Sequence, residues 1–265
     1  INVSIVLKNL GYDNIALGFE AGFTGEEIIR RINDMGIIHD FIHVDSGLSR
    51  INVKIRSDNE SEINGQGPAI EAGHINKLYQ RFDKLKNGDI LVLAGSIPTV
   101  MPDSMYMDIM KYLKGRNIKI VVDATKDLLV NVLEYRPFLI KPNNHELGEI
   151  FGVELKTRDE VVEYAKRLQK MGAVNVLVSM AGEGAVLVAE DGSIFKTPAP
   201  KGVVKNSVGA GDSMVAGFIA GYLNSGNYVE AFKMGVCTGS ASAFSDKLAT
   251  KAEVEALKSC THFNL

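Results

Sequence analysis

Hydrophobic and polar positions follow two different patterns along the chain. After helical patterns over residues 1–10 and near 26–35, residues 37–65 show short alternating segments separated by turn residues. Alternation with a period of two predicts half-buried strands. The turn residues at 45–47 and 57–59 predict hairpins between those strands. We therefore expect a small antiparallel flap over residues 37–65.

From residue 71 onward, helical and strand-like patterns follow one another. The predicted helices cover residues 71–86, 103–115, 125–134, 144–151, 157–171, 211–224, 227–245 and 250–258, and the predicted strands cover residues 90–94, 118–123, 138–141, 174–179, 185–189 and 193–196. One further short strand is predicted earlier in the chain, over residues 14–18. Repeated strand–helix alternation is typical of βαβ units around a mostly parallel sheet. We expect an α/β fold with helices on both faces of that sheet and a hairpin formed by the last two strands.

The amino-acid composition excludes several classes of protein but does not identify a function. Of 265 residues, 46% are hydrophobic and 23% charged, with 29 Lys and Arg against 32 Asp and Glu. These are globular proportions, and the small negative net charge gives no general attraction to nucleic acid or a membrane. The two cysteines and five histidines show neither a disulfide framework nor zinc-ligand spacing. We expect a cytoplasmic protein without a signal peptide.

The start of the sequence is unusual. The chain begins at Ile1, without Met and already inside the first helical pattern. No N-cap residue precedes that pattern, although helices usually begin with one. We expect further residues to precede Ile1 in the protein.

In open α/β sheets, ligands bind beyond the carboxyl ends of the strands. The most distinctive polar segment is Asn206-Ser-Val-Gly-Ala-Gly-Asp-Ser213, which an apolar helix follows directly. Glycines let the backbone approach a ligand, and N–H groups at a helix N-terminus favour an anion. Asp212 could instead serve only the helix dipole. The entropic cost of two glycines at a helix start favours a phosphate-binding loop.

The common nucleotide motifs are absent. The chain has no Gly-x-x-x-x-Gly-Lys-[Ser/Thr], and neither Gly209-x-Gly211 nor Gly182-x-Gly184 completes the dinucleotide fingerprint. The His-Arg-Asp and Asp-Phe-Gly motifs of protein kinases are missing as well. These absences argue against a P-loop enzyme, a Rossmann-type dehydrogenase and a protein kinase.

Three motifs together resemble the PfkB, or ribokinase-like, carbohydrate kinases. The segment ending at Asp212 resembles the family's C-terminal signature, Lys141-Pro-Asn-Asn-His-Glu146 its Asn-x-x-Glu motif, and Ser179-Met-Ala-Gly-Glu-Gly184 its nucleotide-side glycine loop. Further motifs resemble the bacterial 1-phosphofructokinases within the family: Arg50-Ile-Asn-Val-Lys54, Ile63-Asn-Gly-Gln-Gly-Pro68, Gly95-Ser-Ile-Pro98 and Lys141-Pro-Asn143. The resemblance implies a three-layer α/β/α kinase core over residues 1–36 and 66–265, with residues 37–65 as a β-sheet lid over the sugar.

The resemblance assigns roles to residues at the nucleotide end. Asp212 would be the general base, and the N–H groups of Gly209, Ala210, Gly211 and Asp212 would form an anion hole for the transferring phosphoryl group. ATP would contact a set of residues formed by Lys141, Ser179, Gly182, Gly184 and Asn206. Asn143 and Glu146 would hold Mg²⁺, which prefers oxygen ligands, although Asn143 and Glu146 also suit a helix cap. The small residues of 238–245 would admit an adenine ring, or serve tight helix packing.

At the sugar end, Arg50 and Lys54 lie four residues apart and so share one face of a strand. Two cations on one face can hold the phosphate that the substrate already carries, although a solvated strand face is the alternative. The resemblance adds Asn2 as a sugar-hydroxyl contact, and Ser96 is a cleft candidate because it follows the end of a predicted strand. Asp123 at a strand end is a further cleft candidate, whereas His145 is expected to be only a polar helix residue.

The implied reaction is ATP-dependent phosphorylation of D-fructose 1-phosphate to fructose 1,6-bisphosphate. Two alternatives stay open. One is a tagatose 6-phosphate kinase, whose motifs overlap. The other is a non-catalytic sugar-phosphate-binding remnant, because family members begin with a strand bearing a substrate-binding Asp and a Gly-Gly-Lys-Gly motif that this sequence lacks. A homodimer formed through the lid is a further expectation, with no nucleic-acid or membrane partner.

Overall fold

The computed structural model describes residues 1–55, 61–95, 97–98 and 101–263. The chain forms two compact units. The first comprises Ile1–Tyr12, Lys86–Gly95 and Tyr106–Leu265, and the second Asp13–Leu85 and Ser96–Met105. The chain therefore leaves the first unit twice and returns to it twice.

The first unit is organised around a six-stranded sheet in the order β12-β11-β10-β9-β8-β7. Its strands are β7 (Ile90–Ala94), β8 (Lys119–Asp123), β9 (Leu139–Ile140), β10 (Asn175–Ser179), β11 (Ala185–Val188) and β12 (Ile194–Thr197). Strands β7 to β10 run parallel, while β11 and β12 complete an antiparallel edge. The predicted mostly parallel sheet and late hairpin are confirmed.

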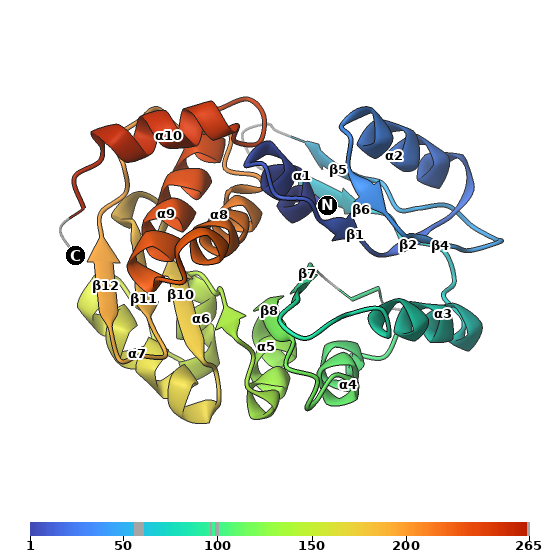
Figure 1. Ribbon diagram of the computed structural model, residues 1–265, viewed down its shortest axis with the longest axis horizontal. Coiled ribbons are helices and arrows are strands. Elements are labelled where there is room, and N and C mark those ends of the chain that lie inside the picture. Colours follow the sequence, from blue (N-terminus) through green and yellow to red (C-terminus); the bar gives the residue numbers. More distant parts are fainter. Residues whose placement is uncertain (56–60, 96, 99–100, 264–265) are drawn as a thin grey trace. The chain divides into compact units, whose positions relative to one another are not determined.

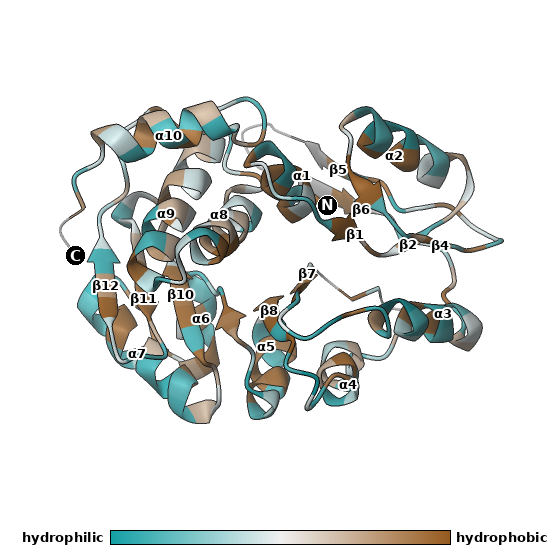
Figure 2. Cartoon of the chain, in the orientation of Figure 1, coloured by the Kyte–Doolittle hydropathy of each residue, from teal (hydrophilic) through white to brown (hydrophobic). Residues whose placement is uncertain are grey.

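Helices cover both faces of this sheet. They are α1 (Asn2–Asn9), α4 (Met105–Tyr112), α5 (Lys126–Val132), α6 (Asn144–Phe151), α7 (Arg158–Met171), α8 (Ala210–Ser225), α9 (Tyr228–Phe244) and α10 (Lys251–Cys260), with 3-10 turns η1 (Leu133–Tyr135) and η2 (Ala181–Glu183). Figure 1 shows α5, α6 and α7 on one side of the strands and α8 and α9 on the other. Figure 2 shows apolar residues concentrated on the strands and polar ones on α7 and α10.

Local sequence explains where several of these helices begin and end. Helices α7 and α10 start with capping boxes in which Thr157 pairs with Glu160 and Thr250 with Glu253. Helix α6 ends at Gly152, whose φ of 68° lies in the left-handed region that favours glycine. Such signals place the predicted bounds of α6, α7 and α10 within two residues of the observed ones.

Helices α8 and α9 pack closely through small residues. A Cβ on Gly221 would lie 2.8 Å from the Cα of Ala231, and one on Gly235 would lie 3.0 Å from the carbonyl oxygen of Met214. A Cβ on Gly239 would lie 3.1 Å from the carbonyl oxygen of Ala210. Close helix packing therefore explains the small residues of α9, and contact with adenine stays a prediction.

In the second unit, the described residues form two helices and three two-stranded sheets. Its elements are β1 (Ile15–Ala16), β2 (Phe19–Glu20), α2 (Gly22–Asp34), β3 (Ile38–His39), β4 (Ile42–His43), β5 (Asn52–Ile55), β6 (Ser61–Asn64) and α3 (Ala72–Phe82). Strand β1 pairs with β3 and β2 with β4, both in parallel, and β5 pairs with β6 antiparallel.

The prediction of antiparallel pairing throughout residues 37–65 is therefore wrong for β3 and β4. These strands pair with the segment that precedes α2, so the turn at 45–47 joins strands that do not pair with each other. Strands of two residues carry too little alternation to reveal their partners. The second predicted turn, 57–59, lies outside the described residues. Residues 37–65 lie wholly in the second unit, and their action as a lid stays a prediction.

Helix α2 begins at Gly22, four residues before the predicted start. The sequence Gly22-Phe-Thr-Gly25 predicts a loop because glycine weakens helices. In the structure both glycines are required by close neighbours, as described below. Among the described residues, no helix is long and apolar enough to cross a lipid bilayer.

Candidate active site

The N-terminus of α8 is shaped by Gly209, its N-cap. Gly209 has a φ of 81°, in the left-handed region, which glycine adopts without steric cost. A Cβ at this position would also lie 2.8 Å from Cδ2 of Leu248. Conformation and space therefore both require glycine where the sequence predicts a tight loop.

The predicted anion hole is only partly available in this geometry. The N–H of Ala210 donates to the carbonyl oxygen of Ser207 at 3.1 Å. The N–H groups of Gly211 and Asp212 lie in the first turn of α8, where no carbonyl of the same helix can accept them. The N–H of Ala210 is thus used within the turn, and binding of an anion by the N–H groups of Gly211 and Asp212 stays a prediction.

A buried chain of hydrogen bonds fixes the Gly209 carbonyl. Ser213 donates to it twice, from the backbone N–H at 2.9 Å and from Oγ at 2.8 Å. Ser242 Oγ in α9 donates to Ser213 Oγ at 2.7 Å, and the N–H of Ala249 donates to Ser242 Oγ at 2.8 Å. Ser213 and Ser242 are fully buried. The loop before α8 is therefore positioned by polar contacts as well as by packing.

Asp212 stands in the first turn of α8 and contacts Asn2. Oδ2 of Asp212 accepts a hydrogen bond from Nδ2 of Asn2 at 2.9 Å, and both side chains are half-buried. The contact joins α1 to α8 across 210 positions of sequence. The second carboxylate oxygen of Asp212 is a further hydrogen-bond acceptor, and the role of Asp212 as general base stays a prediction. The sugar-binding role of Asn2 stays a prediction.

A buried lysine lies beside the same loop. The Nζ of Lys141 is 3.3 Å from Oδ1 of Asp123, and the Lys141 side chain is 7% exposed. A Cβ on Gly211 would lie 3.1 Å from that Nζ. Burial raises the pKa of Asp123, the Lys141 ammonium opposes the shift, and the carboxylates of Asp212 and Glu146 add to it. Asp123 therefore lies within electrostatic reach of one ammonium and two further carboxylates.

Asn143 and Glu146 form the cap of α6. The backbone N–H of Asn143 donates to Oε2 of Glu146 at 2.8 Å, and the N–H of Glu146 donates to Oδ1 of Asn143 at 2.8 Å. The capping role that the sequence left open is thus real. Each acceptor oxygen has a second lone pair, so capping does not exhaust these groups. Their role toward Mg²⁺ stays a prediction.

The turn after β10 lies beside the start of α6. The N–H of Ser179 donates to the carbonyl oxygen of Pro142 at 3.2 Å, so the carboxyl ends of β9 and β10 are adjacent. Gly184 closes the turn at a φ of 95°, and a Cβ there would overlap the carbonyl of Thr197. A Cβ on Gly182 would meet nothing within 4 Å. The structure accounts for Gly184 by packing, and contact of this turn with ATP stays a prediction.

Asn206 begins the loop that leads to Gly209. Its Oδ1 accepts from the N–H of Val208 at 3.1 Å, and its own N–H donates to the carbonyl oxygen of Ala243 at 3.1 Å. These bonds tie the loop to the end of α9. Asn206 therefore shapes the loop, and its contact with ATP stays a prediction.

The predicted sugar-phosphate residues belong to the second unit, apart from Asn2. Arg50 is exposed and lies two residues before the start of β5, so it is not part of the strand that contains Lys54. Lys54 lies in β5 opposite Glu62 of β6, but its side chain lies outside the described part of the chain. Ser96 also lies outside the described residues. Phosphate binding by Arg50 and Lys54 stays a prediction.

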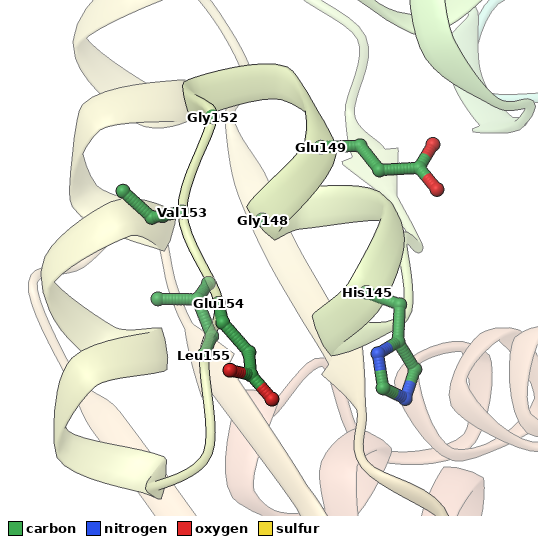
Figure 3. Close-up of a pocket in the computed structure, with 7 residues that line it drawn as sticks. All are labelled: His145, Gly148, Glu149, Gly152, Val153, Glu154 and Leu155. Atoms are coloured by element: carbon green, nitrogen blue, oxygen red, sulfur yellow. The ribbon is translucent and has the colours of Figure 1, made fainter.

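His145 lies in the first turn of α6 and lines a pocket of about 290 Å³. Figure 3 shows this pocket between α6 and the segment that follows it, with His145, Glu149 and Glu154 at its edge. None of the predicted site residues lines it. His145 is thus a polar helix residue, as the sequence predicts.

Tyr106 is a neighbour of the site that sequence reasoning missed. Its hydroxyl donates to the carbonyl oxygen of Gly95, at the end of β7, at 3.0 Å. Burial, reinforced by the nearby Asp123 carboxylate, raises the pKa of Tyr106 to about 12. The only sequence signal is a tyrosine near the start of a helix that follows a predicted strand end.

Comparison with known proteins defines the class to which this arrangement belongs. The pfkB family carbohydrate kinases match residues 1–254, so the chain belongs to this family of phosphotransferases, which transfer a phosphoryl group from ATP to an alcohol group of a sugar. The family, the ribokinase-like fold and the kinase activity expected from the motifs are thereby confirmed.

Within the family, the chain is 45% identical over 257 residues to 1-phosphofructokinase of Bacillus subtilis, covering 97% of this chain and 84% of that protein. It is 34% identical over 256 residues to D-tagatose-1-phosphate kinase of Bacillus licheniformis, covering 96% and 84%. The structure of phosphofructokinase-2 from Escherichia coli in complex with fructose-6-phosphate aligns with a TM-score of 0.88 at 23% identity, covering 97% and 85%. This last likeness shows the fold alone.

Proposed function

We propose that this kinase phosphorylates D-fructose 1-phosphate with ATP, giving fructose 1,6-bisphosphate and ADP. The observation that carries the chemistry is the N-terminus of α8, where Asp212 and the first-turn N–H groups stand beside the buried Lys141. A base, hydrogen-bond donors and a cation at one helix end suit phosphoryl transfer, which depends on positioning and charge stabilisation.

Each of these groups has a role in the proposal. Asp212 accepts the proton of the attacking sugar hydroxyl, and Asn2 holds its carboxylate in place. The N–H groups of Gly211 and Asp212 and the ammonium of Lys141 offset the negative charge of the phosphoryl group. Asp123 fixes Lys141 by an ion pair inside the protein.

The residues present also fit Mg²⁺. The described residues contain no group of three Asp, Glu, His or Cys side chains that could chelate a metal, but Mg²⁺ usually takes one or two carboxylates, substrate phosphates and several waters. Glu146 offers a carboxylate, and the surplus negative charge around Asp123 is what a divalent cation would offset. Glu146 and Asn143 would hold the ion, which would neutralise charge on the triphosphate.

The choice of sugar phosphate rests on the second unit and on the relatives. Arg50 carries a guanidinium, which can bind phosphate in a bidentate manner, and Lys54 follows four residues later, in β5. The name of the Bacillus subtilis relative favours fructose 1-phosphate. The Bacillus licheniformis relative favours a tagatose phosphate, so a tagatose phosphate is the second candidate substrate.

The test is ATP consumption by the purified protein with a panel of sugars. Fructose 1-phosphate, tagatose 1-phosphate, tagatose 6-phosphate and unphosphorylated fructose are compared at equal concentration, with ADP and the bisphosphate both quantified. We expect the highest kcat/KM for fructose 1-phosphate. Preference for a tagatose phosphate would replace the proposed substrate, and binding without turnover of any sugar would show a non-catalytic domain.

We also propose that the protein forms a homodimer through the β5–β6 hairpin. Ile51, Val53 and Ile63 are exposed there, and Val53 lies directly opposite Ile63. An exposed apolar cluster of this kind marks an interaction surface. Sedimentation should give twice the mass of one chain, and Val53→Asp should reduce it to the mass of one chain. An unchanged mass in the variant would contradict this interface.

A further inference from the structure

The segment that leads into Arg50 is held against the start of α2 by buried hydrogen bonds. Oγ of Ser49 accepts from the N–H of Ala21 at 3.0 Å, and the N–H of Ser49 donates to the carbonyl oxygen of Ala21 at 2.9 Å. Oγ1 of Thr24 donates to the carbonyl oxygen of Ser49 at 2.9 Å. Ser49 thus uses its N–H, its carbonyl and its hydroxyl in one contact with the beginning of a helix.

This contact is buried, although the segment around it is exposed. Ser49 and Thr24 are 7% and 8% exposed, and Ala21 is fully buried. Residues 45–48 before Ser49 and Arg50 after it are exposed. The backbone is therefore anchored at one position, immediately before the guanidinium-bearing residue.

The two glycines of α2 make this contact close. A Cβ on Gly22 would lie 2.8 Å from the carbonyl oxygen of Gly47. A Cβ on Gly25 would lie 2.5 Å from Oε2 of Glu20 and 3.0 Å from Oγ of Ser49. The Gly22-Phe-Thr-Gly25 sequence is explained by the same contact, because any side chain there would push residues 47–49 away.

Beneath the contact lies Glu20, which is 6% exposed. Oε1 of Glu20 is 2.7 Å from Nδ1 of His43, and the backbone carbonyl of Glu20 accepts from the N–H of Val44 at 2.8 Å. Glu20 thus connects this contact to β4 and the residue that follows it, through both its side chain and its backbone. A rigid support of this kind limits how far the backbone at Ser49 can shift.

We propose that Thr24 and Ser49 form a clasp that orients Arg50 toward the phosphate already present on the substrate. In this proposal the two hydroxyls are positioning residues, because each is occupied by the protein itself. The inference rests on the proposed function, in which Arg50 binds that phosphate. A guanidinium placed about 1 Å away from its best position loses much of its effect on a bound substrate.

The test is a double-mutant cycle read by sugar selectivity. Thr24→Val keeps the shape of the side chain and removes the hydroxyl, and Thr24→Ser keeps the hydroxyl. We expect Thr24→Val to lower kcat/KM for fructose 1-phosphate about tenfold, while the KM for ATP and kcat/KM for fructose stay near wild type. Thr24→Ser should keep the wild-type preference for fructose 1-phosphate over fructose.

A matched pair of serines gives a second test if Thr24→Val does not fold. Ser49→Ala removes a clasp hydroxyl, whereas Ser46→Ala removes one from an exposed serine three residues earlier. Only Ser49→Ala should reduce the preference for fructose 1-phosphate over fructose. Equal effects of the two variants would overturn the proposal.

The Arg50→Ala background separates this inference from the proposed function. If the clasp acts through Arg50, Thr24→Val should cost less than about twofold in kcat/KM once Arg50 is gone. An unreduced effect of Thr24→Val in that background would overturn the clasp alone and show a role in folding. If Arg50→Ala itself leaves sugar selectivity unchanged, both the phosphate role of Arg50 and the clasp are overturned.

Discussion

The backbone is supported in different ways around the two candidate functional residues Asp212, at the start of α8, and Arg50, within residues 37–65. Asp212 stands on a helix of 16 residues whose first turns are backed by α9. Residues 37–65 contain strands of two and four residues with exposed apolar side chains between them. At α8 the support is continuous, whereas in the second unit it is concentrated in a few buried contacts.

This difference suggests that α8 serves the chemical step and that residues 37–65 serve recognition of the substrate. In the proposed function, the chemistry of phosphoryl transfer, which is common to the family and tolerates little displacement, lies on the most deeply packed helices. Recognition of a particular sugar phosphate must vary among relatives, and short strands on exposed turns can change without disturbing the core. Substitutions at α8 should therefore affect all substrates, and those near Arg50 should affect substrates unequally.

The largest effect is expected from Asp212→Asn. The variant keeps the side-chain volume but cannot accept the proton, so kcat should fall by about 10² or more with every sugar. Thermal unfolding and binding of ATP should stay close to wild type. A kcat within a few-fold of wild type would show that Asp212 is not the base.

Arg50→Ala should impair recognition of the sugar phosphate and leave the reaction chemistry at α8 intact. Loss of a charge-assisted pair is worth about 1.5–3 kcal/mol, or roughly ten- to a hundred-fold. The KM for fructose 1-phosphate should rise by this factor while the KM for ATP changes little. The decisive quantity is the ratio of kcat/KM for fructose 1-phosphate and fructose. An unchanged ratio would place the phosphate elsewhere.

Gly211→Val should give a smaller loss, about tenfold in kcat/KM for all sugars alike. A Cβ at this position would lie 3.1 Å from Nζ of Lys141, so the ammonium must move away from the loop. The lysine end is flexible, and the free energy of unfolding should change less than activity does. Denaturant unfolding and kinetics of the same samples check this, and a loss of stability without a loss of activity would contradict it.

The smallest effect is expected from Glu146→Gln. The amide can still accept from the N–H of Asn143 and so keeps the cap, but it loses the charge that attracts Mg²⁺. The Mg²⁺ concentration for half-maximal rate should rise about three- to tenfold, with kcat recovered at high Mg²⁺. Superimposable Mg²⁺ titrations would show that Glu146 serves only as a cap.

The sequence predicted the first unit better than the second for physical reasons. Long helices such as α7 and α9 carry several periods of their pattern and explicit caps, so their bounds followed within one residue. The parallel pairing of β3 and β4 depends on residues 15–20, which are distant along the chain and leave no mark in local alternation. The helical positions of Gly22 and Gly25 were missed for a similar reason, because the close neighbours of these glycines include residues 47–49, which lie more than 20 positions further along the chain.

For the candidate site, the motifs located Asp212, Lys141 and Glu146, and the structure brings these residues within electrostatic reach of Asp123. Sequence alone could not show that the N–H of Ala210 donates a hydrogen bond to the carbonyl oxygen of Ser207, because that bond depends on the turn geometry. It also could not predict the Ser213–Ser242 bond, which depends on the crossing of two helices.

The contact between Asn2 and Asp212 has a consequence for how the chain folds during synthesis. The two residues are 210 positions apart, and α1 packs against α8 through the apolar side chains of Val3, Val6 and Leu7. At synthesis rates of about 5–20 residues per second, roughly 10–40 s pass between the appearance of α1 and that of α8. During this time the apolar face of α1 lacks its native partner and is open to chaperones. The Asn2–Asp212 contact can therefore form only after α8 has been synthesised.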